Sequence, residues 1–74
     1  MYKYLTYKEK LYHEDIGSYV SYGIVCINLE MGKVVSKIRD VSTDAAFVQA
    51  LAEKFTRMEL SPTQLFDAVE DAIV

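Results

Sequence analysis

Residues that favour strands occupy the first part of the chain, and residues at helical spacing occupy the rest. Tyrosine, valine and isoleucine are frequent before residue 42, and these side chains fit the pleated surface of a sheet. After that point, apolar residues recur at steps of three and four, which places them on one side of a helix. The 74 residues have room for only one small core, so we predict a single domain, 1–74. Its expected fold class is α+β: a three-stranded antiparallel meander followed by an αα-hairpin packed on one sheet face (βββαα).

The first two strands are predicted at 2–12 and 19–30. Polar and apolar side chains nearly alternate in the first, and stiff β-branched side chains dominate the second, which we take as the central strand. Acidic residues, glycine and serine gather at 13–18, where we expect the hairpin loop. Within the central strand, Gly23 has no side chain. Glycine there marks a bulge or a close approach, so we expect a helix or an aromatic ring to cover it.

The turn before the third strand determines which side chains share a sheet face. A two-residue turn at Met31 and Gly32 would place Val25 opposite Ile38 and make one face continuously apolar. The opposite face would then hold the pairs Ile24 with Arg39 and Cys26 with Lys37. A three-residue turn with a bulge is the alternative, and it would shift this register.

Both helices have recognisable starts. We expect the first to begin with Ser42 or Thr43 as its cap and Asp44 in its first turn. The second is expected to begin with Ser61 as the cap, Pro62 at the first helical position and Gln64 completing a capping box. Their predicted apolar stripes are Phe47, Val48, Leu51, Phe55 and Met58 in the first helix, and Leu65, Val69 and Ile73 in the second.

The whole chain resembles a short uncharacterised protein family found in Firmicutes. The resemblance is carried by the Tyr-Gly-Ile step at 22–24 and by the tail SPTQLFDAVEDAIV. It covers the length of the chain and its ending in a capped helix with paired acids. The resemblance implies no activity, and no functional residue is transferred from it.

The sequence lacks the usual constellations of an enzyme or a metal site. One cysteine and one histidine leave no disulfide and no cluster of metal ligands, and no glycine-rich phosphate loop or nucleophile triad is present. The remaining candidates are His13 in the loop, Cys26 in the central strand and the acids Asp67, Glu70 and Asp71 of the second helix. Each has a simpler explanation, as an inert loop histidine, a buried thiol or a solvated acidic face. We therefore predict no catalytic residue, no cofactor and no metal.

Six tyrosines lie in the first two predicted strands and are interleaved with lysines. Tyrosine is enriched at protein interfaces because it offers a large amphipathic surface at low entropic cost. We therefore predict that an exposed sheet face binds another protein or a second copy of the chain. The candidate interface consists of Tyr2, Tyr4, Tyr7, Lys8, Tyr12, Tyr22, Ile24, Lys37 and Arg39. The alternative is a single-stranded nucleic acid stacked on the tyrosines, which the net charge of −3 disfavours.

Charge is distributed unevenly along the chain. Residues 1–13 contain three lysines and one glutamate, whereas residues from 42 onward contain two basic and six acidic side chains. Such an asymmetry can steer a partner. No stretch approaches the ~20 apolar residues that cross a bilayer, and the opening residues do not resemble a signal segment. We expect a cytoplasmic protein that does not enter a membrane.

Overall fold

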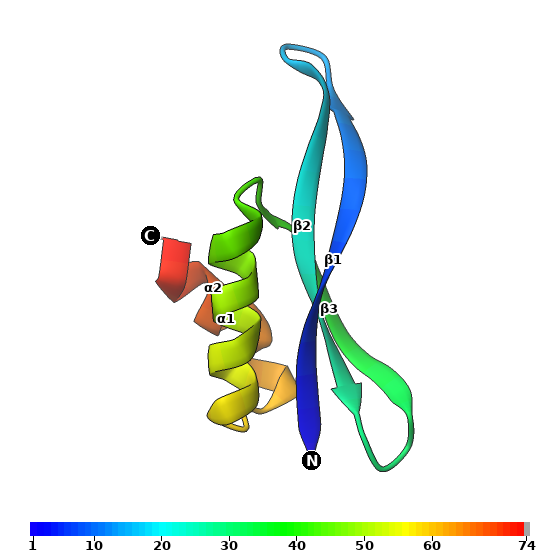
Figure 1. The fold of residues 1–74 in the computed structure, drawn as a ribbon, viewed down its shortest axis with the longest axis vertical. Helices are drawn as coiled ribbons and strands as arrows, with labels where there is room; N and C mark the ends of the chain where they lie inside the picture. Colours follow the sequence, from blue (N-terminus) through cyan, green and yellow to red (C-terminus); the bar gives the residue numbers. More distant parts are fainter. Residues whose placement is uncertain (74) are drawn as a thin grey trace.

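The computed structural model describes residues 1–73. Its elements are β1 (Tyr2–His13), β2 (Gly17–Asn28), β3 (Lys33–Ser42), α1 (Ala45–Arg57), the short 3-10 helix η1 (Pro62–Gln64) and α2 (Leu65–Ile73). The strands form one antiparallel sheet in the order β1-β2-β3, and both α-helices lie on the same side of it (Figure 1). The predicted α+β fold of βββαα order is confirmed. We call the sheet face beneath the helices the helix face and the opposite one the open face.

The first hairpin has a shorter loop than we predicted. His13 pairs directly with Gly17, so residues 14–16 alone form the loop, and 13–18 was too wide. Gly17 has a φ of +78°, in the left-handed region that glycine adopts without strain. A glycine in this conformation at the end of a three-residue loop lets the second strand begin at once.

The second hairpin contradicts the predicted two-residue turn. Residues 29–32 form the loop, and Asn28 is the last residue of β2. The Asn28 side-chain oxygen accepts hydrogen bonds from the backbone N–H groups of Glu30, at 3.0 Å, and Met31, at 3.1 Å. The N–H of Gly32 donates to the Asn28 carbonyl oxygen at 2.8 Å. This side chain therefore closes the turn, and the strands pair in a different register.

The new register reverses the predicted faces of the central strand. Ile24 pairs with Ile38 and Val25 pairs with Lys37, whereas we had expected Val25 opposite Ile38. The four-residue loop alone would shift the register by two positions, and a bulge between Cys26 and Ile27 removes one of them. Because successive strand residues point to opposite faces, the net shift of one position pairs Ile38 with Ile24 and not with Val25. Ile24 and Cys26 point toward the helices and are fully buried. The predicted pairing of Ile24 with Arg39 on an uncovered face is therefore wrong.

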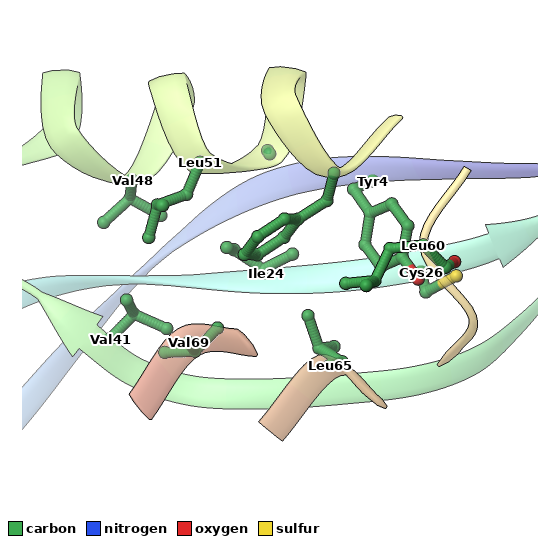
Figure 2. Packing of buried hydrophobic residues seen from close by; sticks show 11 residues of the cluster. Tyr4, Ile24, Cys26, Val41, Val48, Leu51, Leu60, Leu65 and Val69 are labelled. Carbon is green, nitrogen blue, oxygen red and sulfur yellow. Dashed lines mark hydrogen bonds between the residues drawn. The ribbon is translucent and has the colours of Figure 1, made fainter. Parts of the chain in front are cut away.

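The core lies between the helix face and the two helices. Its buried members are Tyr4, Ile24, Cys26, Val41, Val48, Leu51, Ala52, Phe55, Leu60, Leu65 and Val69. Figure 2 shows Ile24 with Val48 and Leu51 of α1 on one side and Leu65 and Val69 of α2 on the other. The predicted helix stripes are correct except at their ends. Met58 and Ile73 are exposed because Met58 caps α1 at its C-terminus and Ile73 is the last residue of α2.

The start of α1 differs by one or two residues from the prediction. Asp44 is the N-cap, and its Oδ1 accepts a hydrogen bond from the Phe47 N–H at 3.2 Å. Ser42, which we expected to be a cap, accepts a hydrogen bond from the Asp44 N–H at 3.0 Å and so holds the cap residue. A carboxylate at this position also benefits from the positive end of the helix dipole.

The second helical segment begins with a 3-10 turn. Ser61 is its N-cap and Pro62 its first residue, as predicted, but the Ser61 side chain makes no capping hydrogen bond. Its hydroxyl instead lies 3.0 Å from Thr63 Oγ1, so the predicted capping box with Gln64 does not form. Within residues 1–73, no helix combines the length and the apolar content that spanning a bilayer requires.

Candidate interaction surfaces

The six tyrosines do not form one surface. Residues directly opposite each other on neighbouring strands share a sheet face. Tyr4 is opposite the buried Cys26 and Tyr22 is opposite Lys8, so both belong to the helix face, as do Tyr2 and Tyr12 by strand alternation. Tyr7 and Tyr19 belong to the open face. The predicted grouping of tyrosines on one exposed sheet face is therefore wrong.

Tyr4 is a core residue rather than an interface residue. Its hydroxyl donates a hydrogen bond to the Leu60 carbonyl oxygen at 2.6 Å, and its N–H donates to Thr56 Oγ1 at 2.9 Å. Its ring meets the Phe55 ring edge to face, with centroids 5.8 Å apart, and burial raises the pKa of its hydroxyl. Tyr4 thus connects β1 to the C-terminal end of α1 and to the chain that follows. Because Tyr4 and Ile24 are both buried, neither belongs to the candidate interface.

The other candidates on the helix face occupy two different environments. Tyr2 and Tyr22 are half-buried and pack against the core. Lys8 and Tyr12 are exposed. Only Tyr7, Lys37 and Arg39 of the predicted interface remain together on the open face.

Tyr7 covers Gly23 at the centre of the open face. A Cβ placed on Gly23 would lie 2.6 Å from the Tyr7 ring and 2.6 Å from the Ile38 carbonyl oxygen. The predicted aromatic cover over Gly23 is therefore confirmed, and the register shifts beside this glycine. Lys37 Nζ lies 4.7 Å from the centroid of the Tyr7 ring, within the range of a cation–π contact. Burial raises the pKa of the Tyr7 hydroxyl, and Glu9 adds to the effect.

An ion pair between Glu9 and Arg39, in which two guanidinium N–H groups donate to one carboxylate oxygen, lies beside Tyr7. Arg39 donates from Nη2 to Glu9 Oε1 at 2.7 Å and from Nε to the same oxygen at 3.2 Å. The Glu9 side chain is mostly buried and that of Arg39 mostly exposed. The hydrogen bonds from Arg39 hold the pKa of Glu9 below its usual range. This pair fixes β1 to β3 across the whole width of the sheet.

Asp40 forms a second polar group on the open face, which sequence reasoning missed. Its carboxylate accepts hydrogen bonds from Ser21 Oγ at 2.5 Å and from the Tyr19 hydroxyl at 3.1 Å. Its backbone adopts a φ of +51°, which a residue other than glycine rarely does. Burial and the hydrogen bond to Asp40 raise the pKa of Tyr19. The residue type is the only signal in the sequence, because aspartate is among the non-glycine residues that adopt this conformation most often.

The end of the open face nearest the second hairpin is apolar. Leu5 and Val34 are exposed there, and Val25 and Ile27 are half-buried. Lys3 lies on the same face, because it is opposite Ile27. The open face thus consists of an apolar end, a charged centre and the Asp40 group.

The first hairpin continues beyond the rest of the sheet. β3 pairs with β2 only from Tyr22 onward, and Lys8 is opposite Tyr22. Residues 9–21 therefore form a two-stranded projection, which we call the finger, and Lys8 lies at its base. Figure 1 shows the finger extending well past both helices.

The three groups that the sequence offered as catalytic or metal-binding candidates lie far apart in the fold. His13 lies at the tip of the finger, Cys26 lies in the core, and the acids of α2 are exposed. The fold does not bring these groups together, and no cluster of metal-ligating side chains occurs in residues 1–73.

Comparison with known proteins places the chain in a family. A family model described as a family of unknown function, DUF6514, matches residues 1–74. The chain belongs to DUF6514. The predicted membership of an uncharacterised family is therefore confirmed, while its distribution in Firmicutes stays a prediction. No curated protein and no solved structure matches this DUF6514 chain, so its function must be inferred from its own surfaces.

Proposed function

We propose that this DUF6514 domain is a protein-interaction module that binds its partner on the open face of the sheet. The supporting observation is that this face has no covering layer among the described residues, although Leu5 and Val34 are exposed on it. Apolar side chains that gather on one face beside charged groups are typical of a protein contact surface.

The chemistry of the open face favours a partner with apolar and acidic residues. The carboxylates of Glu9 and Asp40 already accept hydrogen bonds from neighbouring side chains. Lys3 and Lys37 have no carboxylate partner among residues 1–73. The charges available to a partner are therefore positive. Two copies joined open face to open face would bring these lysines near each other, so we assign the face to a different protein.

Catalysis and nucleic-acid binding have less support. We propose that the domain is not an enzyme, because His13 and Cys26 lie in different parts of the fold and share no site. Stacking of nucleotide bases needs several exposed rings on one face. The tyrosines are divided between two faces, and Lys37 lies over the ring of Tyr7. We retain the cytoplasm as the proposed location, because the only cysteine is a buried free thiol and the fold therefore requires no oxidising compartment.

The test compares two double variants of the tagged domain as baits in cell lysate, with and without nuclease. Leu5→Glu with Val34→Glu places two acids on the open face. Thr43→Glu with Thr63→Glu adds the same charge at exposed positions away from it. We expect wild type and the Thr43/Thr63 variant to retain one protein that the Leu5/Val34 variant loses, independently of nuclease. Circular dichroism checks that all baits are folded.

The retained protein is then purified and titrated against each variant. We expect its affinity for the Leu5/Val34 variant to fall at least tenfold. Equal affinity for both variants would refute the assignment of the open face, as would the absence of any protein that distinguishes them. Binding that disappears with nuclease would favour nucleic acid instead.

A further inference from the structure

The finger and the outer side of α2 both expose apolar side chains that nothing in residues 1–73 covers. On the finger, Tyr12, Ile16 and Val20 are 72%, 68% and 43% exposed. On α2, Phe66 and Ile73 are 61% and 53% exposed. The two surfaces do not cover each other within one chain, because both are exposed in the same structure.

One side of the finger is basic as well as apolar. Lys10 is opposite Val20 and Tyr12 is opposite Ser18, and these pairs continue the helix face beyond the end of the helices. Lys8 lies on the same side by strand alternation. Glu9, the acid between the two lysines in the sequence, points to the open face, where it is bound by Arg39. The finger's other acids, Glu14 and Asp15, lie in the loop at its tip. Both lysines on this side therefore lack a carboxylate partner.

The outer side of α2 has the complementary charge. Phe66, Glu70 and Ile73 recur at steps of four and three, so they share one side of the helix, which adjoins the stripe of the buried Leu65 and Val69. Asp67 and Asp71 are exposed beside them. No lysine or arginine follows Arg57 in the sequence. This side of α2 is therefore apolar and acidic.

We propose that the chain forms a two-fold dimer in which the finger of each copy docks on the outer side of α2 in the other. Lys8 and Lys10 would meet Asp67, Glu70 and Asp71, while Tyr12, Ile16 and Val20 pack against Phe66 and Ile73. Because the finger and the helix are parts of the same chain, a two-fold axis makes this contact twice and closes the assembly. The surface is distinct from the open face, so this inference does not depend on the proposed function.

The size and shape of one chain support a second copy as the occupant. The radius of gyration is 12.7 Å, against about 11.3 Å for a compact domain of this length, and the long axis measures 41 Å. A stable interface buries about 800 Å² on each partner, which is roughly a sixth of the 5031 Å² surface of the chain. Each of the two contacts then needs only about half of that area. Domains this small, lacking disulfides and metals, often gain stability by self-association.

The test exchanges charges between the two surfaces and measures mass by sedimentation velocity. Variant F carries Lys8→Glu and Lys10→Glu, and variant H carries Glu70→Lys and Asp71→Lys. We expect wild type to dimerise, with an affinity that weakens as salt is added. Variants F and H should each self-associate at least tenfold more weakly, because like charges then face each other. A control with Lys3→Glu and Lys37→Glu makes the same charge change on the open face and should dimerise as wild type does.

Mixing F with H supplies the decisive result. In the mixed dimer each finger meets a helix of opposite charge, so we expect a heterodimer of about wild-type affinity. Circular dichroism verifies that F and H are folded, and the restored heterodimer excludes misfolding as the cause of their monomeric state. A monomeric wild type would overturn the proposal. Dimerisation of F equal to that of wild type, or failure of F and H to combine, would overturn it as well.

Discussion

The ring of Tyr7 lies across Gly23, the residue directly opposite it on β2. The glycine leaves the space that the ring occupies, and the Ile38 carbonyl oxygen approaches the same position from β3. An aromatic ring over a strand glycine shields its backbone and replaces the missing side-chain packing. The pair explains why a glycine is placed in the middle of the central strand, where it would otherwise weaken the sheet.

Replacing Gly23 with alanine should destabilise the domain. The new methyl group would lie 2.6 Å from both the ring and the backbone oxygen, so the strands must shift, and overpacking of this kind costs about 1–3 kcal/mol. Urea unfolding should show a lower midpoint for Gly23→Ala. In a double-mutant cycle, Tyr7→Ala should relieve part of this cost. Gly32, which has open space around it, provides the control: the Gly32→Ala cost should not change with Tyr7→Ala. An unchanged midpoint for Gly23→Ala would contradict the geometry.

Removing the Tyr4 hydroxyl should also lower stability. Tyr4→Phe keeps the buried ring but leaves the Leu60 carbonyl oxygen without its donor at 2.6 Å. The loss of such a buried hydrogen bond costs about 1–2 kcal/mol. Tyr12→Phe removes a hydroxyl from an exposed ring and is the matched control. Thermal unfolding should show a lower melting temperature for Tyr4→Phe only. Equal melting temperatures would mean that the contact with Leu60 does not stabilise the fold.

The types and order of the elements followed from local patterns. Periodic spacing of apolar residues and the residues at the helix starts act within a few positions of each other, so they can be read directly from the sequence. The register of β3 depended instead on two features: the Asn28 side chain, which closes a four-residue loop, and a bulge between Cys26 and Ile27, which shifts the pairing back by one position. An asparagine before a turn is a signal of the loop, but the bulge that decides which side chains share a face has no such signal.

The candidate interface was less predictable than the fold. Tyr4 and Tyr7 differ in position by three, so strand alternation alone places them on opposite faces, yet composition grouped them together. The pairing of Glu9 with Arg39 joins residues from the two outer strands and could be found only once the register was known. The exposed side of α2 was predicted only as a solvated acidic face, because Ile73 was taken as part of the buried stripe.

The Glu9–Arg39 pair should make stability depend on acid pH. The pKa of Glu9 is lowered in the folded state, relative to about 4.3 in an unfolded chain. The contribution of ionised Glu9 to the free energy of unfolding is therefore fully present above the pKa of Glu9 in the unfolded chain. It is lost as the pH falls through the lowered pKa of Glu9 in the folded state. Glu9→Gln should remove this part of the pH dependence, measured as urea midpoints between neutral and acidic pH. Glu14→Gln, in the exposed loop, should leave it in place. If the urea midpoint fell equally with decreasing pH in Glu9→Gln and in wild type, the pair would not be the source of this pH dependence.

Glycine in place of Glu59 should stabilise the domain. Glu59 follows α1 with a φ of +51°. Its N–H donates to the Thr56 carbonyl oxygen at 3.2 Å, and the Leu60 N–H donates to that of Phe55 at 3.1 Å, which together form a Schellman motif. For a residue with a Cβ, the left-handed conformation costs about 1 kcal/mol of conformational free energy, whereas for glycine it costs almost nothing. Glu59→Gly should therefore raise the free energy of unfolding by about that amount.

Two further variants separate the backbone effect from the charge. Glu59→Gln removes the unfavourable carboxylate at the negative end of the helix dipole but retains the Cβ, so it should stabilise less than glycine does. Lys54→Gly, at an exposed position inside α1, should lower the free energy of unfolding by about 1 kcal/mol. Urea unfolding of the three variants gives the comparison. If Glu59→Gln stabilised as much as Glu59→Gly, the gain would come from charge, and the left-handed conformation at this position would carry no measurable strain.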